Sequence, residues 1–321
     1  MEHKLPCSYE GILCCFIIPQ MPPERKIMIK NKKALRYLKG YLFLLPNFIG
    51  FFVFMALPII MGFIISLTDY NGFRQFNFVG LKNYIDMFQD EYFRVSLVHN
   101  IVYTLVTVPG TIVFALMLAM AVNQGIKGSG IFKTMFFLPN ISSMVAVGIV
   151  WSMIFNPTVG PLNQLLRSLG IDNPPMWISS TSTALGSIML VAIWKQAGYY
   201  MIILLAGLQA IPSQLYEASS IDGAGAVAKF FKVTLPMLSP TMFMVTILCI
   251  INSFQVFDLV NIMTAGGPGR STNVLVFRIY QEGFQKLQFG YASAMAYFLF
   301  LLVMIITLIQ FRGQKKWVNY M

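Results

Sequence analysis

Polar side chains recur inside a hydrophobic stretch, residues 241–263, at a spacing that would gather them on one helical face. Asn252, Gln255 and Asp258 follow one another about one helical turn apart. Amides both donate and accept hydrogen bonds, and neighbouring phenylalanine rings can pack on the apolar side of a sugar ring, so the combination suits a neutral sugar. The alternative is that Asn252 and Gln255 only hydrogen-bond between helices and that Asp258 is solvated.

A second hydrophobic stretch, residues 184–208, contains Lys195 and Gln196, with Tyr199 about one turn further along. Polar and ionisable groups inside a membrane are costly, and they usually face a bundle interior or a water-filled cavity. Gln196 and Tyr199 are therefore candidates for a polar path through the protein. Lys195 could face the same path or pair with Asp258, and we expect the pair because an unpaired lysine in lipid is unfavourable.

The sequence offers no constellation typical of an enzyme or a metal centre. Neither His3 nor His99 has ligand spacing with a cysteine, and the four cysteines show neither metal spacing nor a disulfide framework. A P-loop sequence, which would cradle nucleotide phosphates, does not occur. We therefore expect this chain to have no catalytic centre, no metal site and no cofactor of its own.

The composition indicates an integral membrane protein. Of the 321 residues, 57% are hydrophobic and 11% are charged, whereas soluble domains carry about 25% charged residues. The net charge of +11 could suggest a nucleic-acid partner, but the basic residues crowd into tails and loops instead of onto one folded face. Such a distribution is a signal of membrane topology, so we expect no nucleic-acid partner.

Six hydrophobic stretches are long enough to cross a bilayer as helices. They are residues 41–68, 97–122, 134–155, 184–208, 241–263 and 290–311. Most Lys and Arg residues outside them lie on the side that holds both termini, which places both termini in the cytoplasm of a multi-pass cell-membrane protein. Short amphipathic helices are expected outside the membrane over residues 81–88 and 162–169.

The stretches divide the chain into a cytoplasmic N-terminal tail (1–40), a transmembrane domain (41–311) and a cytoplasmic C-terminal tail (312–321). Residues 1–27 differ from the basic sequence that follows, because they hold three cysteines and an apolar patch too short to span a bilayer. We expect Met28 to be the natural start of the chain and the preceding residues to be an extension of the gene model.

The loop between the fourth and fifth stretches has a helical pattern of its own. Ser213 can cap a short helix over residues 214–220, and the glycines within residues 222–225 then break it. A second short helix is expected over residues 227–233, ended by the Leu-Pro pair that follows because proline disfavours helix at the preceding residue. The pattern predicts a cytoplasmic helix-turn-helix shaped to be held by another protein.

Small, acidic and proline residues recur in this loop at fixed spacing. The positions are Glu217, Ala218, Ser219, Asp222, Gly223, Ala224, Phe230, Leu235, Pro236 and Pro240. They resemble the EAA loop of permease subunits in binding-protein-dependent ABC importers, although Ser219 stands where the family often has alanine. The resemblance implies an all-α fold of six transmembrane helices with coupling helices between the fourth and the fifth. The alternative is a loop that packs only on its own bundle.

The same resemblance implies a role for particular residues of the loop. The coupling helices of the family dock into a cleft of the ATP-hydrolysing subunit. Glu217 would reach a basic residue in that cleft, and an interfacial charge of this kind fixes register and is costly to leave unpaired. Gly223 would supply the turn between the two helices.

Two longer segments, residues 194–224 and 257–296, narrow the resemblance to the carbohydrate branch of these importers. They are similar to the first permease subunit of maltose-, lactose- and glycerol-phosphate-type systems. The resemblance implies an ATPase dimer that uses ATP and Mg, a second homologous permease, surrounding membrane lipid, and an extracytoplasmic solute-binding protein received by outer loops that include residues 266–268. The implied substrate is a sugar or oligosaccharide that crosses between the two permeases.

Other functions stay open from the residues. An ABC permease for an amino acid, a polyamine or glycerol phosphate is the nearest alternative. A stand-alone secondary transporter or channel would need ionisable relays inside the membrane, and the hydrophobic stretches hold few ionisable groups. A membrane-embedded enzyme would need a convergent constellation of His, Asp or Glu.

Overall fold

The computed structural model describes residues 23–73, 77–125 and 128–318. Most of the expected gene-model extension, residues 1–27, lies outside the described residues, as does His3. The described backbone is helical apart from loops and one isolated antiparallel bridge in a loop. The predicted all-α class is therefore confirmed.

The chain divides into two compact units, residues 1–60 and 61–321. In the first unit, α1 (Pro23–Phe51) runs through a π-helical turn (Phe52–Ala56) into α2 (Leu57–Ser66), whose second half belongs to the second unit. From residue 37 to residue 65, the hydrophobic side chains of this helical run are mostly exposed, as expected of a helix that faces lipid.

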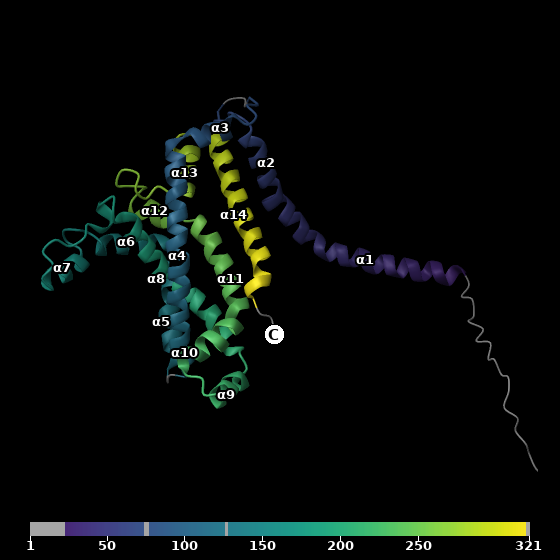
Figure 1. Cartoon of the computed structure of the whole chain (residues 1–321). Coiled ribbons are helices and arrows are strands. Elements are labelled where there is room, and N and C mark those ends of the chain that lie inside the picture. Colours follow the sequence, from purple (N-terminus) through teal and green to yellow (C-terminus); the bar gives the residue numbers. More distant parts are fainter. Residues whose placement is uncertain (1–22, 74–76, 126–127, 319–321) are drawn as a thin grey trace, which may run out of the picture. The chain divides into compact units, whose positions relative to one another are not determined.

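The second unit contains the helices from α3 to α14 (Figure 1). Their bounds are α3 Lys82–Gln89, α4 Glu91–Asn123, α5 Ser129–Ile141, α6 Met144–Ile154, α7 Pro161–Ser168, α8 Ala184–Gln209, α9 Ser213–Ile221, α10 Ala226–Lys229, α11 Leu235–Phe254, α12 Asp258–Met263, α13 Leu275–Tyr280 and α14 Phe289–Trp317. The helices α3 and α13 lie at one end of this unit, and α9 lies at the opposite end (Figure 1). The short helices predicted over residues 81–88 and 162–169 are α3 and α7.

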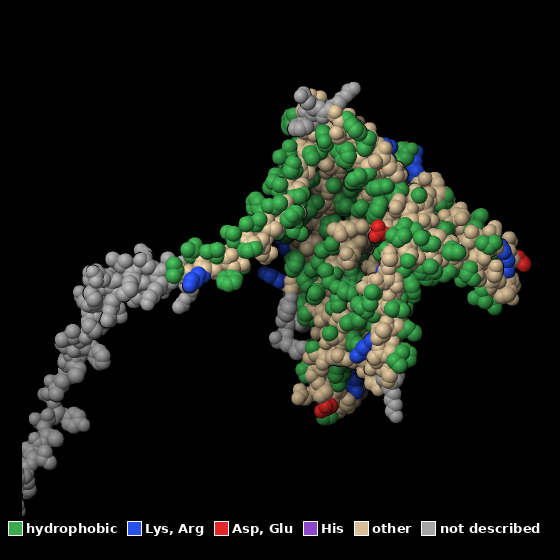
Figure 2. All heavy atoms as spheres, turned by 180° about the vertical axis from the view of Figure 1, so that it is seen from behind, with side chains coloured by type: hydrophobic (Ala, Val, Ile, Leu, Met, Phe, Trp, Pro, Cys, Tyr) green, Lys and Arg blue, Asp and Glu red, His purple; other side chains and the backbone are tan. Residues whose placement is uncertain are grey.

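Five described helices are long and apolar enough to cross a membrane, and a sixth span results if one bent pair is counted. They are Tyr37–Ser66, Glu91–Asn123, Ala184–Gln209, Ala226–Phe254 and Phe289–Lys315. Hydrophobic side chains cover most of the flank that Figure 2 shows. The predicted spans agree with these helices except at the third and the fifth.

The third predicted span, residues 134–155, is not one straight helix. It consists of α5 and α6, which meet at an angle of 95°. Ser142 and Ser143 between them are extended, with ψ of 143° and 135°. Pro139 lies within α5 and has no N–H to continue the helical hydrogen bonds, so the helix is weakest just before the bend.

The fifth predicted span, residues 241–263, is wrong at both ends. The helix begins at Ala226 and ends at Phe254, and residues up to 263 form the separate helix α12. Val256 and Phe257 leave the helix and pack against a buried cluster that includes residues of α6 and α8. Both side chains are half-buried there.

The helical start and stop signals of the loop after α8 are also corrected. Ser213 is the first residue of α9, Pro212 stands before it, and no side chain caps the helix. The Leu235-Pro236 pair does not end the second short helix, because α10 continues through a π-helical turn (Phe230–Thr234) into α11. Pro236 is tolerated here because a local π-helical adjustment accommodates the backbone groups that a proline leaves without a partner.

Helix α8 forms the centre of the second unit. Its side chains contribute to two of three buried hydrophobic clusters, one shared with α4 and α11 and one shared with α6 and α12. It also meets α5 without intervening side chains at Gly198, where a Cβ would collide with the carbonyl of Phe136. These contacts make α8 the element against which the others are placed.

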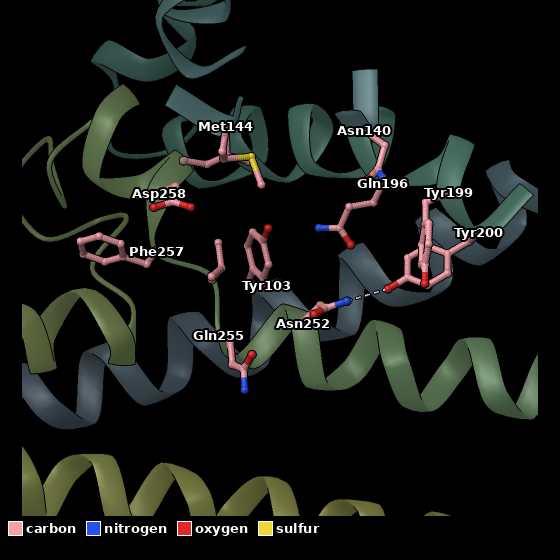
Figure 3. Close-up of a pocket in the computed structure, with 12 residues that line it drawn as sticks. Tyr103, Asn140, Met144, Gln196, Tyr199, Tyr200, Asn252, Gln255, Phe257 and Asp258 are labelled. Carbon is pink, nitrogen blue, oxygen red and sulfur yellow. Dashed lines mark hydrogen bonds between the residues drawn. The ribbon is translucent and has the colours of Figure 1, made fainter. Parts of the chain in front are cut away.

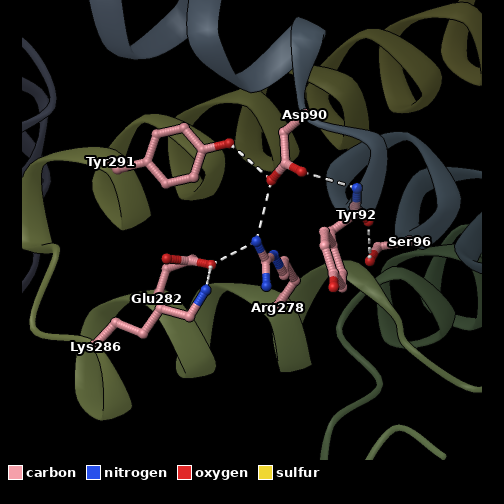
Figure 4. A network of polar contacts seen from close by, with 7 residues as sticks. All are labelled: Asp90, Tyr92, Ser96, Arg278, Glu282, Lys286 and Tyr291. Carbon is pink, nitrogen blue, oxygen red and sulfur yellow. Dashed lines mark hydrogen bonds and ion pairs between the residues drawn. The ribbon is translucent and has the colours of Figure 1, made fainter. Parts of the chain in front are cut away.

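A polar cluster, which we call the Arg278 cluster, joins α4, α13 and α14 (Figure 4). The Arg278 guanidinium lies 3.1 Å from the Asp90 carboxylate and also contacts Glu282. Lys286 donates to the same carboxylate oxygen of Glu282 at 2.7 Å, and the Tyr291 hydroxyl donates to Asp90 at 3.1 Å. Both Arg278 and Glu282 are buried, so each compensates the charge of the other where water does not reach.

Asp90 also caps α4 by accepting a hydrogen bond from the backbone N–H of Tyr92 at 2.8 Å. Burial alone would raise the pKa of Asp90. The hydrogen bond from Tyr92 and the hydrogen bond and charge of Arg278 outweigh burial, and they hold the pKa of this carboxyl below its ordinary value of 3.8. The ring of Tyr92 is in turn contacted by the exposed Arg270, whose guanidinium carbon lies 3.7 Å from the ring centre.

Candidate functional site

A cavity of about 420 Å³ lies within the second unit, between α4, the α5–α6 bend, α8 and the break after α11 (Figure 3). Its wall combines amides, tyrosines, a carboxylate and apolar side chains. The lining residues are Tyr103, Asn140, Met144, Gln196, Tyr199, Tyr200, Asn252, Gln255, Val256, Phe257, Asp258 and Leu259. This size is within the range of about 300–1,000 Å³ that is usual for small-molecule sites.

The predicted residues Asn252, Gln255 and Asp258 all line the cavity, but the helix break places them differently from the prediction. Asn252 belongs to the last turn of α11, Gln255 follows it, and Asp258 begins α12. They therefore reach the cavity from two sides of the break instead of from one helical face. Gln255 points away from the amide of Asn252 and also lines a second hollow between α11 and α14 (Figure 3).

Gln196 and Tyr199, the candidates on α8, also line the cavity. The Gln196 amide points into the space between Tyr103 and Asn252 (Figure 3). The Nδ2 group of Asn252 donates to the Tyr200 hydroxyl at 2.9 Å. The alternative of a hydrogen bond between helices is thus correct for this amide group, and the bond fixes two polar side chains in the cavity wall.

The expected ion pair of Lys195 with Asp258 is wrong for the described structure. Lys195 is buried, and its Nζ donates to the backbone carbonyls of Pro139, Asn140 and Ser142. Asp258 instead stands at the cavity wall. The sequence correctly indicated that Lys195 needs a polar partner inside the membrane. The partners are backbone carbonyls and not a carboxylate.

Seven lining residues were not among the candidates from the sequence: Tyr103, Asn140, Met144, Tyr200, Val256, Phe257 and Leu259. Asn140 offered a signal, because it is an amide inside the third hydrophobic stretch. Tyr200 follows Tyr199 directly, and their rings meet edge to face with centroids 5.1 Å apart. Tyr103 and Met144 look like ordinary core residues in a sequence, so only the fold assigns them to the cavity.

The chemistry of the wall follows from these groups. Amide and tyrosine side chains can donate to and accept from hydroxyl groups, and the aromatic rings offer apolar faces. Among the described lining residues, Asp258 carries the only formal charge. The wall can therefore bind a neutral molecule with many hydroxyls, and its one negative charge disfavours an anion.

A second candidate region is the coupling segment, which we define as residues 213–236. Here α9 ends at a turn where Gly223 adopts a left-handed φ of +75°, and α10 follows. This turn needs glycine because other residues rarely adopt that conformation. The Tyr216 hydroxyl lies 3.1 Å from the Thr234 hydroxyl, which ties α9 to the start of α11.

Half of the eight residues predicted for coupling are exposed in the coupling segment. Exposed side chains or positions are Glu217, Ala218, Asp222 and Gly223, while Ala224, Phe230, Leu235 and Pro236 are half-buried. Four large apolar side chains are also exposed: Ile221 by 87%, Val227 by 71%, Phe231 by 60% and Leu215 by 38%. The coupling role of this segment stays a prediction.

Within the described residues, no three His, Cys, Asp or Glu side chains gather as a metal site would require. Cys249 is buried and free, and the other three cysteines lie outside the described residues. His99 lies on α4, and its Nδ1 is 3.1 Å from the backbone carbonyl oxygen of Asn273, in the loop before α13.

Comparison with known proteins places the chain in a family. Residues 101–317 match the model of the binding-protein-dependent transport system inner membrane component. The chain is 39% identical over 298 residues to the probable ABC transporter permease protein YesP of Bacillus subtilis, covering 91% of this chain and 96% of the relative. It is 33% identical over 285 residues to the sn-glycerol-3-phosphate transport system permease protein UgpA of Yersinia enterocolitica, covering 87% and 95%.

The fold also has solved counterparts. A chain in the crystal structure of a bacterial alginate ABC transporter, in complex with an alginate pentasaccharide-bound periplasmic protein, matches with a TM-score of 0.78. It is 23% identical, and the match covers 89% of this chain and 96% of that chain. This likeness supports the fold, and the sequence matches carry the assignment. The chain belongs to the family of binding-protein-dependent transport system inner membrane components, as a multi-pass ABC transporter permease.

Proposed function

We propose that the chain is one of two unlike permease subunits of an ATP-driven importer and that it forms part of the path for a neutral sugar or oligosaccharide. The observation that carries the proposal is the wall of the cavity, where amides and tyrosines surround a space of about 420 Å³. Hydroxyl-rich solutes need such paired donors and acceptors, because an unpaired polar group in a closed site is costly.

The charge of the wall favours a neutral solute over an acidic one. Asp258 is the only formally charged side chain among the described lining residues, and it would repel a phosphate or a uronate. The proposal therefore separates this chain from two of its similar proteins, whose names refer to sn-glycerol-3-phosphate and to the acidic polysaccharide alginate. A polyamine is the competing solute, because the same carboxylate would attract a cation.

Other partners follow from the family. An ABC ATPase dimer, which uses ATP and Mg, would dock on the coupling segment at the cytoplasmic side, where both termini also lie. The exposed Ile221, Val227 and Phe231 support docking, because large exposed apolar groups outside lipid mark interaction sites. A second homologous permease would close the path, and an extracytoplasmic binding protein would deliver the solute to the outer loops.

The test reconstitutes the assembled transporter, with its binding protein, in proteoliposomes and follows ATP-dependent uptake. We expect uptake of a neutral oligosaccharide, little uptake of a uronate oligosaccharide, and no competition by a polyamine. The Asp258→Asn variant should reduce the discrimination against the acidic sugar, while a matched variant outside the cavity, Asp172→Asn, should not. Preferred uptake of the acidic sugar or of the polyamine by the wild type would refute the neutral-sugar proposal.

Docking is tested separately by co-purification of the tagged chain. The wild type should retain an ATPase and a second permease, and Glu217→Ala should weaken retention of the ATPase because it removes an interfacial charge. A chain that purifies alone in gentle detergent would contradict the importer proposal.

A further inference from the structure

We infer that Lys195 is a positioning residue that holds the α5–α6 bend in place and thereby sets one wall of the cavity. Its Nζ lies 3.0 Å from the carbonyl oxygen of Pro139, 3.2 Å from that of Asn140 and 3.0 Å from that of Ser142. An ammonium group has three N–H donors. Three carbonyls therefore use its whole hydrogen-bonding capacity, which is the geometry of a clamp.

The bend needs these donors. The last carbonyls of a helix have no intrahelical partner, and at membrane depth an unsatisfied carbonyl costs several kcal/mol. The first of them, on Leu138, accepts from the backbone N–H of Ser142 at 3.3 Å and from its hydroxyl at 3.2 Å. Lys195 donates hydrogen bonds to carbonyls that follow. Because its side chain is only 4% exposed, these bonds take the place of hydrogen bonds from water.

Charge strengthens the same contact. The C-terminal end of a helix carries a partial negative charge, so a cation placed there is stabilising. In the described structure, the hydrogen bonds of the Lys195 amine go to backbone carbonyls at the end of α5, with no ion pair to a carboxylate. The lysine is thus directed at the bend itself.

The bend is part of the cavity wall. Asn140 precedes it, Met144 follows it, and both line the cavity. Gln196, the neighbour of Lys195, lines the same space from α8. A change in the angle of the bend would move Asn140 and Met144 relative to Gln196, so the clamp sets the distances between these parts of the wall. This step rests on the proposed function, in which the cavity is the solute path.

Helix α8 also links the clamp to the coupling segment. Gly198, about one turn after Lys195, lies against the backbone of Phe136 in α5. Only residues 210–212 separate the end of α8 from α9. A displacement of α9 would therefore be transmitted along α8, which contacts α5 at Gly198 and the bend at Lys195.

The experiment measures the bend in the assembled transporter, in nanodiscs. Spin labels are attached to cysteines at Ile131 on α5 and Met153 on α6, which are 76% and 67% exposed, with the native cysteines replaced by serine. The Lys195→Met variant should broaden the distance distribution and shift its centre. The conservative Lys195→Arg should keep the wild-type distribution, and so should the matched control Leu190→Met, an exposed position on the same helix.

Transport gives the second measurement. Because a displacement of about 1 Å can cost as much as ~100-fold in rate, we expect Lys195→Met to lower solute uptake per ATP hydrolysed by about ten-fold or more. The Lys195→Arg variant should restore most of it. A wild-type distance distribution in Lys195→Met would overturn the inference, whatever the uptake.

The two proposals fail differently. The distance measurement needs no solute, so a wrong substrate class abolishes uptake in the wild type and leaves the effect of Lys195→Met on the bend intact. If Lys195→Met does not assemble, Lys195→Gln is measured instead, because its shorter, uncharged side chain has two N–H donors and cannot make the three contacts. A broadened distribution in that variant supports the clamp, and an unchanged one refutes it.

Discussion

Asp90 and Arg278 form an ion pair of 3.1 Å although 188 residues separate them in the chain. The pair joins the start of α4 to α13, and Glu282 contacts the same guanidinium from within the next turn. A charge pair that spans so much sequence cannot be inferred from local patterns. It closes the second unit at the end that faces away from the coupling segment (Figures 1 and 4).

Removal of the central cation should destabilise the second unit. In Arg278→Met, Asp90 and Glu282 both lose the guanidinium, although Glu282 keeps Lys286, and the loss of one member of a buried pair costs about 3 kcal/mol. In the control Arg270→Met, the exposed pair with Glu91 and the contact with Tyr92 are lost, which costs about 1 kcal/mol or less. Thermal unfolding of the purified chain in nanodiscs gives both shifts. Equal shifts would contradict a dominant role for the buried arginine.

The Arg278 cluster should also make stability depend on pH. Because the folded pKa of Asp90 is held below 3.8, its stabilising contribution is complete above the unfolded pKa and is lost as the pH falls through the folded pKa. The Tm of the wild type should exceed that of Asp90→Asn at about pH 6, and the difference should narrow below about pH 4. If the difference in Tm between the wild type and Asp90→Asn stayed constant from about pH 6 to about pH 3, the charge of Asp90 would not be the source of the stabilisation.

Close packing of α5 on α8 predicts a strong effect of one added methyl group. Gly198→Ala should cost about 1–3 kcal/mol, because its Cβ would collide with the backbone of Phe136. Gly186→Ala lies on the same helix with no neighbouring atom within 4 Å, so it should be neutral or slightly stabilising. Thermal unfolding of the two variants distinguishes close packing from a general intolerance of alanine in α8.

The turn of the coupling segment predicts a selective loss of docking. Gly223→Pro cannot adopt the φ of +75° and should abolish retention of the ATPase and coupled transport, while membrane insertion stays intact. The matched Gly225→Pro replaces a glycine whose φ of −72° suits proline, so it should retain the ATPase. Co-purification measures both, and normal uptake by Gly223→Pro would refute the role of the turn.

Much of the fold could be predicted from the sequence because hydropathy directly determines which helices can span a bilayer. The two helices of the coupling segment were also predictable, since glycines mark the turn at residues 222–225. The breaks at Ser142 and at Gln255 were not. Both stretches are apolar enough overall to be interpreted as one span, and each break depends on tertiary partners that a local pattern does not contain.

The candidate site divides in the same way. Polar residues inside apolar stretches identified Asn252, Gln255, Asp258, Gln196 and Tyr199, and the structure brings all five to one cavity. The partner of Lys195 was missed because backbone carbonyls are present at every residue and leave no trace in the sequence. A search for a carboxylate therefore selected the wrong partner.

The exposed apolar residues of the coupling segment have a consequence for the life of the protein in the cell. In the proposed assembly, a copy made without the ATPase would hold Ile221, Val227 and Phe231 in water, where chaperones and proteases recognise such surfaces. Synthesis in excess of the partner subunits would then end in degradation. The abundance of this chain should accordingly follow that of the scarcest subunit, whatever the strength of its own promoter.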